Sequence, residues 1–147
     1  MQKFKFKMES ILNLKNRIAE QKELEFAKAL AVVENEKILL AHYNKNKTDT
    51  LDHFKTEIDN KISPIEFKVI INYLEFTNNN IHYQKGAIAK AEKTAEKKRL
   101  ELVEATKERK MLDKLKENKY EIFLEDGKKQ EQKQIDEVVS YQYSNSI

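Results

Sequence analysis

Apolar side chains recur every seven residues along the first part of the chain. One row contains Leu12, Ala19, Phe26, Val33 and Leu40, and a row beside it contains Ile11, Ile18, Val32 and Leu39. A seven-residue period keeps one helix face turned toward a partner helix, as in a coiled coil. We therefore predict a helix over about residues 6–60. Its solvent face is expected to carry the charged residues between the rows, namely Lys15, Arg17, Glu20, Lys22, Glu23 and Lys28.

The second half of the chain repeats this pattern. One row contains Phe67, Leu74, Ile81, Ile88, Ala95 and Leu102, and a companion row contains Ile70, Ala91, Ala105 and Leu112. The pattern predicts a second helix from residue 64 to about residue 125 or beyond. Alanine lines much of its seam, and small side chains bury little area, so we expect weaker packing there.

The only proline lies between these two patterns, in the stretch Ser63-Pro64-Ile65-Glu66. Proline cannot continue a helix that arrives from its N-terminal side, but it fits the first position of a new helix. Ser63 and Glu66 have the spacing of a capping box. We therefore predict a turn at about residues 60–63 that folds the helices against each other, with residue 4 opposite about residue 120.

The predicted fold is all-α: a long antiparallel two-helix coiled-coil hairpin forming a single domain over residues 1–147. The polar stretch near residues 44–50 is expected to be frayed or bent. We also expect Gly127 to break or kink the second helix, and residues 140–147 to form a disordered tail.

Composition supports long helices and narrows the possible functions. The chain has 2 Gly and 1 Pro, which leaves few residues for tight turns. Its 28 basic and 25 acidic residues alternate along the helices, so we expect no nucleic-acid surface. It has no cysteine, and no apolar run approaches the ~20 residues that span a bilayer. The basic N-terminus lacks a signal-peptide core, so we expect a soluble cytoplasmic protein.

No residue pattern indicates catalysis, a cofactor or a metal site. There is no phosphate-binding loop and no cysteine nucleophile. His42, His53 and His82 are too widely spaced for a helical metal pair, although His42 and His82 approach each other in the predicted hairpin. We interpret these histidines as polar residues beside the seam.

Apolar side chains exceed what one seam can cover at two places. The chain begins with Phe4, Phe6 and Met8, opposite Tyr120, Ile122, Phe123 and Leu124. The start of the second helix carries Phe67, Val69, Ile70, Ile71, Tyr73, Leu74 and Phe76. Exposed apolar clusters indicate partner surfaces. The alternative is a wider seam or a third segment folded over it.

In order along the chain, several features resemble the FliJ family of the flagellar type III export apparatus. They are the Phe-Lys-Phe start, the Leu/Ala/Glu-rich first helix, the run from Lys107 to Glu117, and the charged segment from Glu131 to Glu137. The resemblance implies a hairpin similar to the central stalk subunit of rotary ATPases. It also implies a non-enzymatic protein at the flagellar base, on the cytoplasmic side of the inner membrane.

The resemblance further implies three partners: the hexameric export ATPase, the cytoplasmic domain of the export gate, and export chaperones. The ATPase-facing end is expected to contain Phe4, Phe6, Arg109, Leu112, Lys116, Asp136 and Glu137. The gate-facing surface is expected to contain Leu40, Tyr43, Ile70 and Leu74. The polar residues Asn44 to Lys47 depart from the family pattern at the edge of this surface.

Two other functions compete with this interpretation. The chain is alternatively a generic coiled-coil adaptor or self-associating scaffold, since two hairpins can pair into a four-helix bundle. A third possibility is a protein that binds nucleic acid or acidic membranes. A steep loss of duplex DNA binding with increasing salt concentration would identify nucleic-acid binding.

Overall fold

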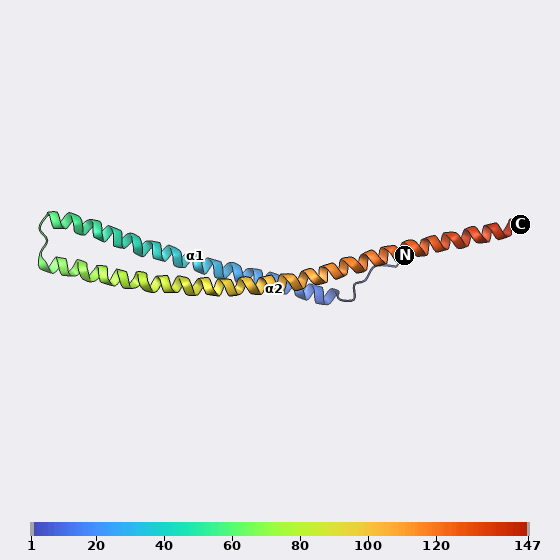
Figure 1. Ribbon diagram of the computed structural model, residues 1–147, viewed down its shortest axis with the longest axis horizontal. Helices are drawn as coiled ribbons and strands as arrows, with labels where there is room; N and C mark the ends of the chain where they lie inside the picture. The colour runs from blue at the N-terminus through green and yellow to red at the C-terminus, as the bar shows by residue number, and fades with distance from the viewer. Residues whose placement is uncertain (1, 147) are drawn as a thin grey trace. The chain divides into compact units, whose positions relative to one another are not determined.

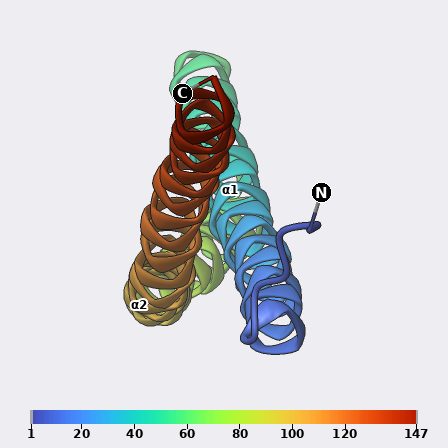
Figure 2. The same cartoon turned by 90° about the vertical axis from the view of Figure 1, so that its right-hand side faces the viewer.

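The computed structural model describes residues 2–146 and consists of two α-helices joined by one short turn (Figure 1). Helix α1 spans Glu9–Asp59 and helix α2 spans Pro64–Asn145. Figure 2 shows α1 and α2 from the end. The described residues 2–146 contain no other helix. The predicted all-α fold of two packed helices is confirmed.

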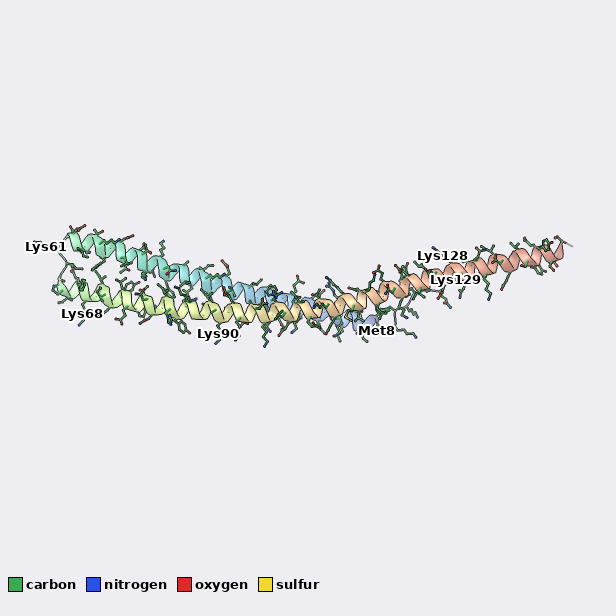
Figure 3. All side chains as sticks on the ribbon, viewed as in Figure 1. Met8, Lys61, Lys68, Lys90, Lys128 and Lys129 are labelled. Atoms are coloured by element: carbon green, nitrogen blue, oxygen red, sulfur yellow. The ribbon has the colours of Figure 1, made fainter. Side chains whose placement is uncertain are left out.

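The turn is built largely as the sequence predicts. Pro64 is the first residue of α2, and the backbone N–H of Glu66 donates a hydrogen bond of 3.2 Å to Ser63 Oγ. The N–H of Phe67 donates to the Ser63 carbonyl at 3.0 Å. Before them, Lys61 has a positive φ of 61°, the left-handed conformation in which a helix often ends. Lys61 and Lys68 lie on the two sides of this turn (Figure 3).

The chain forms two compact units. Unit 1 contains Met1–Glu20 and Val103–Ile147, and unit 2 contains Gln21–Leu102. Each unit packs a part of α1 against a part of α2. In unit 1, Glu9 pairs with Lys116 at 2.9 Å and Lys15 pairs with Glu108 at 2.8 Å. Because partner numbers fall along α2 as they rise along α1, the helices are antiparallel there.

The buried side chains belong to the predicted seven-residue rows. In unit 1, Leu12 and Ala19 of α1 and Ala105 of α2 are buried, and in unit 2 Val33 of α1 and Ile81 and Ala95 of α2 are buried. The neighbouring row on α1 lies at the margin of the seam, because Ile11 is 45%, Val32 50% and Leu39 38% exposed, and only Ile18 is half-buried. The seam therefore contains fewer apolar side chains of α1 than the two predicted rows together.

Polar side chains complete the seam of unit 2. Gln84, only 3% exposed, donates through Nε2 to the Glu36 carbonyl oxygen at 2.9 Å and also to the Glu36 carboxylate. Thr77, also 3% exposed, donates to the carbonyl of Tyr73 within its own helix at 2.9 Å. Hydrogen bonding offsets the cost of burying these groups.

Four charged residues bridge α1 and α2 in unit 2. Lys22 lies 3.3 Å from Glu101 and 3.5 Å from Glu25, and Lys98 lies 3.5 Å from Glu25 and 3.6 Å from Glu101. The hydrogen bond between Lys22 and Glu101 raises the pKa of Lys22 and lowers the pKa of Glu101. The pKa of Glu25 is lowered chiefly by the Gln21 amide, and then by Lys22 and Lys98.

The expected solvent positions of Lys15 and Lys22 are therefore wrong. Both side chains reach across to carboxylates of α2 and are about 30% exposed. They lie seven residues apart, with Glu36 further along the same row. A long lysine side chain can lay its methylene groups along the seam while its ammonium group stays partly in water, so this row is compatible with packing.

The helices also continue where the sequence suggested interruptions. Residues 44–50 are helical rather than frayed, and the Thr48 and Thr50 hydroxyls donate to carbonyls four residues earlier, at 3.0 and 2.8 Å.

Gly127 lies within α2, whose flanking Lys, Glu and Gln residues favour helix and outweigh a glycine cost of about 1 kcal/mol. The helix extends to Asn145, so the expected disordered tail is wrong over Ser140–Asn145; Ile147 lies outside the described residues. Helix α1 begins at Glu9 rather than near residue 6.

Replacing Leu12 by alanine tests the unit 1 core. Leu12 is 3% exposed, so Leu12→Ala should lower the free energy of unfolding by about 2–4 kcal/mol through lost burial and a new cavity. Leu14 is 54% exposed, and Leu14→Ala should change it by less than about 0.5 kcal/mol. Urea denaturation followed by circular dichroism measures both. Equal losses for the two variants would contradict this packing.

Acid should weaken the charged cluster of unit 2. A carboxylate whose pKa is lower in the folded than in the unfolded state stabilises the folded state at every pH above its unfolded pKa. This stabilisation is lost as the pH falls from the unfolded pKa through the folded pKa. Thermal unfolding between neutral pH and about pH 3 should therefore show a falling midpoint. Glu101→Gln should reduce that fall, whereas Glu23→Gln, an exposed residue outside the cluster, should leave it unchanged. An identical acid dependence in both variants would exclude the cluster as its source.

Candidate partner-binding surfaces

An aromatic cluster in unit 1 joins the segment before α1 to α2. The ring centroid of Phe4 lies 5.2 Å from that of Tyr120, edge-on, and 5.6 Å from that of Phe123. Tyr120 and Phe123 are themselves stacked with centroids 6.5 Å apart. The predicted placement of residue 4 opposite about residue 120 is thus confirmed. Tyr120 keeps 46% of its surface exposed, so the cluster also presents an aromatic face to solvent.

Four other predicted ATPase-end residues lie within the packing of unit 1. Phe6 and Leu112 are half-buried, and Lys116 is paired with Glu9. Arg109 is also half-buried, and its Nε is a buried donor without a hydrogen-bond partner, 3.9 Å from the nearest carboxylate oxygen of Asp113.

Asp136 and Glu137 lie on a different part of unit 1. All described residues of α2 after Phe123 are exposed, including these two carboxylates, and Asp136 accepts a 2.9 Å hydrogen bond from Gln132 Nε2. Figure 3 shows Lys128 and Lys129 on this part of α2. An apolar patch of Ile135, Val138 and Val139, each more than half exposed, shares the segment. No described contact joins Asp136 or Glu137 to the aromatic cluster.

The four predicted gate residues are half-buried rather than exposed. Leu40 continues the buried row of Leu12, Ala19 and Val33 on α1, and Leu74 belongs to the row of Ile81 and Ala95 on α2. Tyr43 and Ile70 are half-buried as well. Much of each side chain therefore serves the contact between the two helices of unit 2.

A separate apolar row on α2 faces solvent in this unit. Val69, Phe76 and Tyr83 follow one another at seven-residue spacing and are 62%, 60% and 78% exposed. We call these three residues the outer row. Tyr73, 42% exposed, adds a neighbouring ring with its centroid 6.5 Å from that of Phe76. The excess of apolar residues at the start of α2 was predicted, but Tyr83 was not included in it. Its spacing of seven residues from Phe76, and of fourteen from Val69, was the available signal.

The described residues offer little for metal chemistry. They contain no group of three His, Cys, Asp or Glu side chains arranged to hold a metal ion. His42 Nε2 lies 3.4 Å from the Asn46 side-chain amide, a local contact within α1. Within the same residues, neither helix has a stretch with the length and hydropathy required to cross a bilayer.

Comparison with known proteins identifies a family for this fold and sequence. The fold is similar to that of a putative YscO homolog from Chlamydia trachomatis, with a TM-score of 0.72 and 18% sequence identity over 97% of this chain and 96% of that one. No curated protein matches the chain in sequence. The family model described as "Flagellar FliJ protein" matches residues 4–147. The chain therefore belongs to the FliJ family of flagellar proteins.

Proposed function

We propose that this chain is a non-enzymatic, central-stalk-like component that binds the hexameric flagellar export ATPase and links it to the export gate and to export chaperones. Membership of the FliJ family makes it a component of flagellar type III export. The proposal places it in the cytoplasm, peripheral to the inner membrane at the flagellar base. The observation that carries the proposal is that each compact unit has its own exposed apolar surface, which its two helices leave uncovered.

The aromatic cluster of unit 1 is the proposed ATPase-binding surface. Aromatic side chains contribute strongly to interfaces because they bury a large area with few rotatable bonds. Here Phe4 fixes the segment before α1 against Tyr120 and Phe123, so the exposed aromatic face is already ordered before binding. Leu112, Lys116 and Arg109 are half-buried and support it from within the unit. Asp136 and Glu137 extend the surface along α2.

The outer row of unit 2 is the main proposed gate-binding surface. Val69, Phe76 and Tyr83 lie on the side of α2 that α1 does not cover, and a partner can bury them without opening the helix pair. Leu40, Tyr43, Ile70 and Leu74 are half-buried, so their main role here is to position the helix that carries this row. Their exposed atoms provide the rim of the contact.

The proposed mechanism requires no chemistry from the chain itself. A protein that contacts one conformation of its partner better than another shifts the partner's populations by that difference in binding free energy. Unit 1 would act on the ATPase in this way, favouring its assembled, active ring. Unit 2 would hold the gate through a separate surface, so each contact can be weakened without the other.

Two variants with opposite expected effects test this assignment. Phe4→Ala removes the residue that orders the aromatic cluster and should reduce stimulation of the export ATPase about tenfold, equivalent to about 1.4 kcal/mol of contact energy. It should leave affinity for the isolated gate domain unchanged. The double variant Phe76→Ala with Tyr83→Ala should weaken gate binding by about tenfold or more and leave ATPase stimulation intact. ATPase assays and isothermal titration calorimetry measure the two effects.

Each variant is the control for the other, and circular dichroism verifies that both remain helical. Loss of both activities in either variant would indicate general unfolding or one shared surface. Retention of both activities in both variants would reject these surfaces. Absence of any effect of the unmodified chain on the ATPase would favour the generic adaptor instead.

A further inference from the structure

A groove runs beside the seam of unit 2, between α1 and α2. Its volume is about 290 Å³, and it is lined by Ala29, Val32 and Glu36 of α1 and by Ala87, Lys90, Ala91 and Thr94 of α2. Three of the lining residues are alanines, whose methyl side chains leave space beside them. The groove can hold one large apolar side chain.

The apolar residues beside this groove have no cover in the described chain. Val32 is 50% exposed, and Leu39, seven residues later on the same face of α1, is 38% exposed. The seam itself is already closed by Val33, Ile81 and Ala95, so the helix pair gains nothing by leaving Val32 and Leu39 in water. Apolar side chains in such a position at a concave surface favour a docked partner helix.

Most of the charges around the groove that no ion pair neutralises are positive. Lys90 lies at its edge, at the outer side of α2 in Figure 3, and Lys97 follows seven residues later on the same face. Lys28 lies four residues before Val32 and so adjoins the groove from α1. All three are exposed, and none takes part in an ion pair among residues 2–146.

Of the neighbouring carboxylates, Glu25 is paired with Lys22 and Lys98. Glu36, which also lines the groove, accepts hydrogen bonds only from the neutral Gln84 amide and so keeps its negative charge. A partner that approaches the groove therefore meets three unpaired lysines and this one carboxylate. Complementary charge suppresses wrong partners and speeds the encounter with the right one.

We propose that this groove binds an acidic amphipathic helix of a partner protein. The helix inserts one leucine-sized side chain between Ala29, Ala87 and Ala91, and its Asp or Glu residues face Lys28, Lys90 and Lys97. Lys90 and Lys97 are about 10 Å apart along α2, at 1.5 Å per residue. Two acidic residues seven positions apart, with the apolar residue midway between them, match this spacing. The inference concerns a third surface and does not rest on the proposed ATPase or gate contacts.

The probe is a fluorescent, covalently stapled helical peptide of about 18 residues. It carries a central leucine with glutamates three residues before and four residues after it, and a matched peptide carries lysines in place of those glutamates. With the full-length chain, fluorescence anisotropy should give at least about tenfold tighter binding for the acidic peptide, falling with salt. Replacing the central leucine by alanine should weaken binding at least about fivefold.

Charge reversal on the protein provides the decisive comparison. Lys90→Glu with Lys97→Glu should reverse the preference so that the basic peptide binds tighter. The matched control, Lys107→Glu with Lys114→Glu, makes the same change in net charge at the same seven-residue spacing on exposed positions of unit 1. It should retain at least about half of the affinity for the acidic peptide.

Several results would overturn the proposal. They are no binding of the acidic peptide, equal binding of the two peptides, or equal losses in the groove variant and its control. A second copy of this chain is the competing occupant. Sedimentation velocity would reveal this occupant as self-association of the chain. Self-association that is abolished by Lys90→Glu with Lys97→Glu, but is not inhibited by the acidic peptide, would also overturn the proposal.

Discussion

Two packed helices can bury only one stripe of each, and this constraint governs the rest of the molecule. A third layer would cover the remaining apolar side chains, but residues 2–146 contain only α1 and α2. The buried row is therefore short of large residues, with alanine at 19, 95 and 105. Apolar residues outside that row, such as those of the outer row, remain available for partners. The same constraint thus explains both the modest core and the exposed surfaces.

Polar contacts across the seam specify how the two helices align. An apolar row that repeats every seven residues packs almost equally well when one helix slides by seven residues, so apolar packing alone does not distinguish these registers. The Gln84–Glu36 hydrogen bonds do distinguish them, because a slide of seven residues would place Gln84 opposite Ala29 or Tyr43. The Lys22–Glu101 ion pair does not, because the same slide in one direction brings Lys22 opposite Glu108. Exposed ion pairs contribute little free energy individually. The value of the Gln84–Glu36 contact here is specificity of alignment.

The sequence was sufficient to predict the fold because its strongest signals agree. Pro64 and Ser63 mark the turn, and the heptad rows that contain Leu12 and Ile81 mark the two buried faces. It was not sufficient to distinguish seam lysines from solvent lysines. Lys15 and Lys22 have the same chemistry as Lys28, and only the position of a carboxylate on the other helix separates them.

The partner surfaces were harder to predict for a related reason. Leu74 and Phe76 both belong to seven-residue rows on α2, and the rows differ only in which side of the helix they occupy. That difference depends on how α1 packs, a tertiary property. At Gly127 the prediction gave too much weight to a single residue. Glycine disfavours helix, but its neighbours favour helix strongly enough for α2 to continue through it.

The alignment of α1 with α2 in unit 2 decides which side chains lie in the seam, and electron paramagnetic resonance distances measure it. The chain has no cysteine, so spin labels attach only at introduced ones. Lys37 lies 3.7 Å from Glu92, which makes Lys37→Cys with Glu92→Cys the native pair. This pair should give the shortest distance between labels. Pairing Lys37→Cys with Lys85→Cys, or with Arg99→Cys, shifts one label by about 10 Å along α2 and should give longer distances. A shorter distance for either shifted pair would rule out this alignment.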